Sequence, residues 1–160
     1  MANRLTTMTA TALAATGLLL CACDGSSAWA PARLGFYFNQ DGQDANLAYG
    51  AANSDDVGLM LQCAKGSHEV ELTDVASAKD DASLVLASGD RRLVAPARIS
   101  VDETGAPLAQ TDLPVDSPVL QGFRDSGAIA VSLGRSHYAL RARREEAAAV
   151  SSFFSACEKS

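Results

Sequence analysis

The sequence lacks the residue patterns that mark the common catalytic and cofactor sites. There is no G-x-S-x-G nucleophile elbow, because the nearest string, GRSHY at residues 134–138, lacks the second glycine. No H-E-x-x-H motif, phosphate-binding loop or dinucleotide fingerprint occurs either. Ser136 and His137 are neighbours on a predicted strand, so their side chains point to opposite faces and cannot form a nucleophile–base pair. These absences predict a domain that is not an enzyme and carries no cofactor. A hydrolase would need a pocket in which His137 meets a carboxylate.

Potential metal ligands are also scarce. The chain has only two histidines, His68 and His137, and four cysteines, so a thiol-based metal site would be short of ligands. The polar stretch QDGQDAN at residues 40–46 reads as a turn or loop. It contains Asp41 and Asp44 but lacks the alternating ligands and the closing glutamate of an EF-hand loop. We therefore expect no metal site.

No apolar run is long enough to cross a bilayer comfortably, but a shorter one lies at the N-terminus. Residues 5–20 contain no charged side chain and follow Arg4, whereas a spanning helix needs about 20 mostly apolar residues. A basic start, a short apolar core and small residues near its end are typical of a secretory signal peptide. The sequence thus predicts an exported protein with a removable signal at residues 1–22.

The end of this run, Leu20-Cys21-Ala22-Cys23, resembles the lipobox of bacterial lipoprotein precursors. The small residue before Cys23 fits that motif, whereas the large Leu20 before Cys21 does not. The resemblance implies that the chain is cut before Cys23, that this cysteine is lipidated, and that more than one acyl chain anchors it stably to a membrane. It also implies that Asp24 favours retention in the inner membrane.

A second possible cleavage site would release the chain instead of anchoring it. The sequence AWA at residues 28–30 has the A-x-A form of an ordinary signal-peptidase site, but Pro31 follows directly and disfavours cleavage. Both alternatives place Cys63 and Cys157 in an oxidising compartment, where cysteine pairs persist as disulfides. We therefore predict a disulfide between Cys63 and Cys157.

Acidic side chains outnumber basic ones, 19 against 13, for a net charge of −6 at pH 7. An acidic domain is a poor candidate for binding nucleic acid or anionic lipid headgroups. Guanidinium groups nevertheless gather near the C-terminus, and they suit bidentate contact with carboxylate or phosphate. They predict an anionic partner, such as a wall polymer or an acidic protein surface. The alternative is a solvated basic surface without a partner. The candidate partner-binding residues are Arg135, Arg141, Arg143 and Arg144.

Residues 33–160 read as a single extracytoplasmic domain behind a short lipidated tether at residues 23–32. Several segments alternate apolar and polar side chains, and one of them, VGLMLQC, places Cys63 on its apolar face. Frequent turn signals between the segments favour an antiparallel sheet that is curled or sandwich-like. Strands are predicted at residues 34–39, 57–63, 68–74, 82–88, 92–101 (broken at Pro96), 128–134 and 136–142.

Two helices are predicted in the last third of the chain. The first follows Ser117 as N-cap, with Pro118 at the first helical position and Gly127 as the stop. The second begins at about Arg143 and runs to the C-terminus. Its apolar residues recur at spacings of three and four and so share a face: Ala147, Val150, Phe153, Phe154 and Cys157. The expected fold class is α+β, an antiparallel sheet with the C-terminal helix packed across it and one disulfide.

The strings CAKGSHEVEL and ASLVLASGDRRLVA, within residues 63–97, resemble the membrane-bound inhibitors of C-type lysozyme. The matching positions are Cys63, Gly66, Val70, Leu72 and Leu84. The resemblance implies a disulfide-closed β-barrel that blocks a wall-degrading enzyme with a protruding loop, for which residues 39–53 are the candidate. The chain departs from that family because it lacks the Ser-Gly-x-x-Tyr string and ends in an additional helix.

The leading functional hypothesis is a membrane-anchored cell-envelope lipoprotein that acts as a non-catalytic binding or assembly module. It would lie on the periplasmic face of a membrane and bind another envelope protein or a wall component. The alternatives are an inhibitor of a wall-degrading enzyme and an envelope hydrolase. A binding module predicts an exposed apolar or basic patch without a deep polar cleft, whereas an inhibitor predicts a protruding loop.

Overall fold

The computed structural model describes residues 33–76 and 83–159, which belong to one structural unit spanning Pro31–Ser160. The predicted signal peptide, the predicted lipidation site Cys23 and the residue after it, Asp24, lie outside the described residues. No helix within the described ranges is long and apolar enough to cross a membrane.

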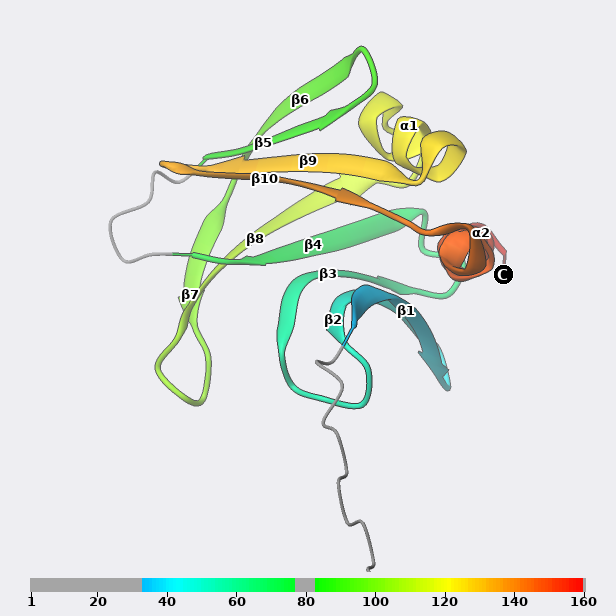
Figure 1. The fold of residues 1–160 in the computed structure, drawn as a ribbon, viewed down its shortest axis with the longest axis horizontal. Helices are drawn as coiled ribbons and strands as arrows, with labels where there is room; N and C mark the ends of the chain where they lie inside the picture. The colour runs from blue at the N-terminus through cyan, green and yellow to red at the C-terminus, as the bar shows by residue number, and fades with distance from the viewer. Residues whose placement is uncertain (1–32, 77–82, 160) are drawn as a thin grey trace, which may run out of the picture. The chain divides into compact units, whose positions relative to one another are not determined.

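Two antiparallel sheets form the domain, as Figure 1 shows. The large sheet has the strand order β1-β2-β3-β4-β8-β7 and the small sheet has the order β10-β9-β5-β6. The large sheet comprises β1 (Leu34–Asp41), β2 (Asp44–Ala51), β3 (Val57–Ala64), β4 (Glu69–Val75), β7 (Arg98–Val101) and β8 (Pro107–Pro114). The small sheet comprises β5 (Ser83–Ser88), β6 (Arg91–Pro96), β9 (Ala128–Leu133) and β10 (Ser136–Arg141). The helical segments are α1 (Pro118–Ser126), the 3-10 turn η1 (Arg144–Glu146) and α2 (Ala147–Glu158).

The core lies between the inner faces of the two sheets and is completed by the two helices. Alternation along each strand sends Leu61 and Leu72 inward from the large sheet, and Leu86 and Val131 inward from the small one. Phe123 of α1 joins the same buried cluster. The predicted fold class is therefore confirmed: an antiparallel, sandwich-like α+β domain with a helix packed across it.

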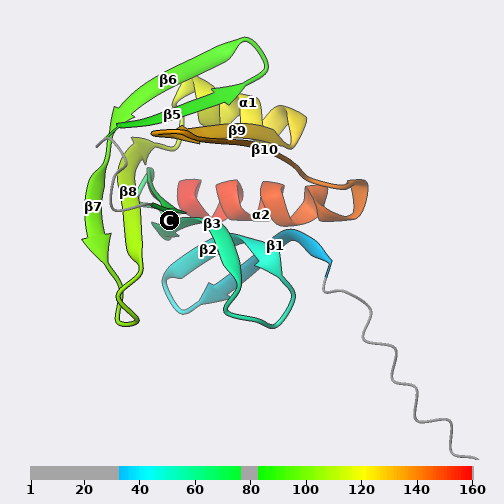
Figure 2. The same ribbon diagram turned by 60° about the vertical axis from the view of Figure 1, so that its left-hand side comes forward.

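The C-terminal helix α2 packs on β1 and β2, and Figure 2 shows it lying between these strands and the small sheet. Phe153, Phe154 and Cys157 are fully buried on its inner face. Ala147 was expected on that face but is exposed, so this expectation was wrong. Ala147 is the first residue of α2, and burial on that face begins one turn later, at Val150.

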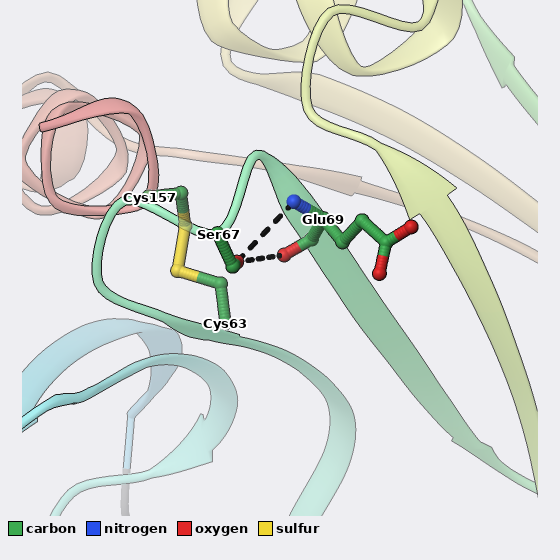
Figure 3. The surroundings of a disulfide bond; sticks show 4 residues. All are labelled: Cys63, Ser67, Glu69 and Cys157. Atoms are coloured by element: carbon green, nitrogen blue, oxygen red, sulfur yellow. Dashed lines mark hydrogen bonds between the residues drawn. A yellow bond between two sulfur atoms is a disulfide. The ribbon is translucent and has the colours of Figure 1, made fainter. Parts of the chain in front are cut away.

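The predicted disulfide is confirmed, because Cys63 on β3 is bonded to Cys157 on α2 with their Cα atoms 5.8 Å apart (Figure 3). The turn after β3 also satisfies carbonyl groups at the end of α2. Gly66 N–H donates to the Ala156 carbonyl over 3.1 Å, and His68 N–H donates to the Cys157 carbonyl over 3.2 Å. The last carbonyls of a helix lack partners within the helix, so this turn and the disulfide together fix the end of α2.

The β3–β4 turn is closed by its own side chain as well. Ser67 Oγ donates to the Glu69 carbonyl over 3.0 Å and accepts from Glu69 N–H over 3.3 Å (Figure 3). His68 has a φ of 58°, in the left-handed region. Its backbone carbonyl accepts from Val115 N–H over 2.9 Å. His68 therefore shapes a turn, and its exposed side chain is free to be solvated.

Helix α1 begins and ends where the capping signals predicted. Gly127 adopts φ 66° at the C-terminus and its N–H donates to the Phe123 carbonyl. At the other end Ser117 occupies the N-cap position, but its side chain makes no capping hydrogen bond. The boundaries of α1 thus follow from Pro118 and Gly127 rather than from a serine cap.

Two strands were not predicted from the sequence. The polar stretch at residues 40–46 contains the expected turn at residues 42 and 43, but its other residues are the end of β1 and the start of β2. Residues 39–53, proposed as a protruding inhibitory loop, form most of the β1–β2 hairpin. The other unpredicted strand, β8, lies between β4 and β7. Both strands bury small or polar residues, Ala45 on β2 and Ala109 and Thr111 on β8, which weakens the apolar alternation.

Candidate binding surface

The outer face of the small sheet carries a row of small side chains. Ala139 on β10 pairs with Ala130 on β9, Ala130 pairs with Ala87 on β5, and Ala87 pairs with Arg92 on β6. Directly paired residues share a face, so three alanines and one arginine cross the sheet side by side. Because alanine is short, an open hollow of about 390 Å³ forms there, bounded by Arg141 at the end of β10.

Each candidate arginine has its own place in the fold. Arg141 ends β10 and Arg144 starts η1, so their Cα atoms are at most about 11 Å apart along the chain. Both side chains are exposed, and neither forms an ion pair with any described residue. Arg135 precedes β10 at its other end, about 20 Å from Arg141 at the rise of an extended strand. Arg141 and Arg144 therefore lie near one end of β10, and Arg135 lies at the other end.

Arg143 has a structural role. Its guanidinium pairs with the buried carboxylate of Glu146, and its backbone N–H donates to Glu146 Oε2 over 2.9 Å. Glu145 lies 3.4 Å away on the exposed side. The hydrogen bond and charge of Glu146 raise the pKa of Arg143 above its ordinary value. Because its charge is matched locally, Arg143 fixes η1 and contributes little net charge to the surface.

A buried polar contact between the two sheets had not been identified from the sequence. Tyr138 Oη on β10 donates to Asp74 Oδ1 on β4 over 2.6 Å, and Asp74 is only 3% exposed. The same carboxylate oxygen accepts from Val75 N–H over 2.9 Å. Burial, and then the hydrogen bond to Asp74, raise the pKa of Tyr138 above its ordinary value, so the phenol remains a neutral donor. The contact ties the small sheet to the large one.

His137, which the hydrolase alternative would place in a pocket beside a carboxylate, lies on the surface. His137 Nδ1 lies 2.7 Å from Ser132 Oγ on the neighbouring strand, and the ring is exposed. Among the residues that the structure describes, no carboxylate makes a salt bridge or hydrogen bond with His137. Among the described residues, no three histidine, cysteine, aspartate or glutamate side chains are grouped so that they could hold a metal ion. This geometry holds a surface histidine in one orientation and assembles no proton-transfer chain.

Comparison with known proteins adds no assignment. Neither protein-family models, nor curated proteins, nor solved structures give a match to this chain.

Proposed function

We propose that this chain is a cell-envelope lipoprotein, anchored through Cys23, whose domain at residues 33–160 acts as a non-catalytic binding module. The domain would face the periplasm, and its partner would be another envelope protein or a wall component. The lipobox-like sequence before Cys23 supports the anchor. The disulfide between Cys63 and Cys157 is consistent with an oxidising compartment.

The observation that carries the binding role is an unpaired arginine, Arg141, beside an open hollow, with a second unpaired arginine, Arg144, three residues further along the chain. Arg141 and Arg144 project from a domain that is acidic overall, and the hollow next to Arg141 is floored by alanines. Guanidinium groups recognise carboxylate and phosphate in bidentate geometry. We infer that the partner presents anionic groups at this surface. Cross-linking in intact cells, followed by mass spectrometry of the lipidated protein, tests this role. A folded and anchored protein that yields no reproducible adduct would contradict it.

The anchor is tested by replacing each cysteine of the lipobox-like sequence in turn. Cys23→Ala should abolish acyl labelling and move the protein out of the membrane fraction, because no lipid would then hold it. Cys21→Ala is the matched control and should leave both properties unchanged, since Cys21 lies within the removed signal. Acyl labelling that persists without Cys23 would show that the anchor has been assigned to the wrong residue.

A further inference from the structure

Strand β10 is an edge of the small sheet and pairs only with β9 among the described strands. Ala142 N–H donates to the Gly127 carbonyl over 2.7 Å. Ala142 therefore directs its N–H toward β9, and this shows which residues of β10 face β9 and which face away. In an antiparallel pair, every second residue directs its N–H and C=O away from the neighbouring strand. On β10 these residues are His137, Ala139 and Arg141. Within residues 33–76 and 83–159, no hydrogen bond uses their backbone groups.

Nothing in β10 prevents a further strand from pairing with it. Exposed edges are commonly blocked by proline, a bulge, a charge or a covering element. The register of β10 with β9 is unbroken, the strand contains no proline, and its one arginine, Arg141, is its last residue. That charge opposes a basic strand but favours an acidic one. The side chains of β10 are exposed or half-buried, as expected for an uncovered edge. Figure 1 shows β10 beside β9, running from the β9–β10 turn toward α2.

Two of the other edges are less open than β10. Strand β6 ends in Pro96, whose backbone has no N–H to donate. Strand β7 is only four residues long. Strand β10 therefore offers a longer proline-free edge than either of them.

Charge determines what kind of strand could bind there. Arg135 lies just before β10 and Arg141 at its end, and neither pairs with an acidic residue in the described ranges. Antiparallel pairing of two copies would bring Arg135, just before β10 in one copy, near Arg141 at the end of β10 in the other. Like charges opposite one another are destabilising. The edge therefore disfavours a second copy of this chain and favours an acidic strand.

An added strand would also cover apolar surface. Tyr138 and Leu140 on the inner side of β10 are only half-buried, although they pack against the core. On the outer side, the alanine-floored hollow reaches Ala139 and Arg141 and can receive a side chain from the added strand. Backbone pairing at an edge gives affinity, while such side-chain pockets give specificity.

We propose that β10 binds an extended, acidic segment of a partner protein by strand addition. The N–H and C=O groups of His137, Ala139 and Arg141 form the new ladder, and Arg135 and Arg141 select acidic residues near its two ends. This inference rests on the proposed binding role and names its site and the chemistry of its partner.

The test uses the full lipidated protein in its membrane, with a benzophenone amino acid in place of His137 as the photo-crosslinking probe. Ala139→Pro removes an outward N–H that β9 does not use, and proline is tolerated at such an edge position. Val94→Pro makes the matched change on β6, where Val94 also lies at a non-bonded position of its two-residue hairpin. We expect the adduct yield to fall at least tenfold with Ala139→Pro and to be unchanged with Val94→Pro.

A second pair of variants tests the charge and does not depend on proline. Arg135→Glu with Arg141→Glu should reduce the adduct at least tenfold. Lys65→Glu with Lys159→Glu changes the net charge equally on other surfaces and should not reduce the adduct.

Mass spectrometry should place the cross-link in an acidic protein segment. Full adduct yield with Ala139→Pro, or adducts to wall glycan or to a second copy, would overturn strand addition. A second probe at Arg144 separates the hypotheses: adducts there alone contradict only strand addition, whereas no adduct at either probe contradicts the binding role itself.

Discussion

At the scale of single residues, the contact between Tyr138 and Asp74 connects the two sheets. A hydrogen bond to a buried carboxyl group is worth more than an exposed one, because neither partner can turn to water once it is broken. Asp74 occupies an inward position on β4, after Val70 and Leu72. An apolar residue would simply extend the core at that position, whereas the carboxyl group specifies which residue of β10 must face it.

Removing the hydroxyl should therefore lower stability measurably. We expect Tyr138→Phe to reduce the free energy of unfolding in urea by about 1–3 kcal/mol. The matched control is Tyr37→Phe, because Tyr37 Oη donates to the Arg33 carbonyl over 3.1 Å at an exposed site. That change should stay within about 0.5 kcal/mol of the wild type. Equal effects of the two substitutions would deny the Asp74 contact a special role.

The pH dependence of this effect follows from the direction of the shift. The pKa of Tyr138 is raised in the folded protein, so the unfolded chain loses the phenolic proton first as the pH rises past about 10. The stabilisation is fully present below that pH and decreases above it. The difference between wild type and Tyr138→Phe should be constant from neutral pH to about pH 9 and narrow at higher pH.

Residue-level prediction from the sequence succeeded for the disulfide. Cys63 and Cys157 each fell on an apolar face, and their pairing followed. Asp74 was missed although it occupies the inward position of an alternating strand, where a carboxylate is a signal in itself. Its partner on β10 lies 64 residues further along the chain, and no local pattern could have identified it.

At the scale of elements, α2 depends on distant attachments more than on its own ends. Its N-terminus has no side-chain capping bond and its first turn has no acidic residue. The disulfide and the two hydrogen bonds from the β3–β4 turn hold its C-terminal end. The ion pair between Arg124 and Glu158 adds a link from α1. Most of the stability of α2 therefore comes from tertiary contacts, as is usual for short helices.

Cutting the disulfide should affect the whole domain. The bond closes a loop across a sequence separation of 94, and removing such a native crosslink typically costs about 2–5 kcal/mol. We expect Cys157→Ser to lower the free energy of unfolding by this amount and to reduce the melting temperature. Reduction of the wild type should reproduce the loss, while reductant should not affect the variant further. Two titratable thiols in the folded, non-reduced protein would contradict the crosslink.

The elements that were predicted correctly carry strong local signals, and the missed ones do not. Strands such as β3 and β9 alternate large apolar residues with polar ones, and α1 is bounded by Pro118 and Gly127. Strand β8 instead has a proline at each end and buries Ala109 and Thr111. Its place between β4 and β7 is determined by long-range pairing, which period-two patterning does not report.

At the scale of the whole molecule, the distribution of charge over the surface matters more for partner binding than the net charge. The chain carries a net charge of −6, yet Arg141 and Arg144 form a local basic site whose neighbours do not neutralise it. Of the arginines identified from the sequence, Arg143 is matched by Glu146 and Arg135 lies at the far end of β10. Sequence clustering therefore identified the region, but only the fold distinguishes free guanidinium groups from paired ones.

Replacing Arg141 and Arg144 together should weaken partner binding without unfolding the domain. Arg141→Gln with Arg144→Gln should lower the yield of partner adduct about tenfold at low ionic strength, as expected for two exposed charges that face an anionic surface. It should also flatten the dependence of that yield on salt, because the screened attraction would be gone. Lys65→Gln with Lys159→Gln removes the same charge from other exposed sites and should leave both quantities unchanged. If the arginine variant, with an unaltered melting temperature, bound as well as the wild type in low salt, Arg141 and Arg144 would belong to the solvated surface. Recognition would then have to depend on another part of the domain.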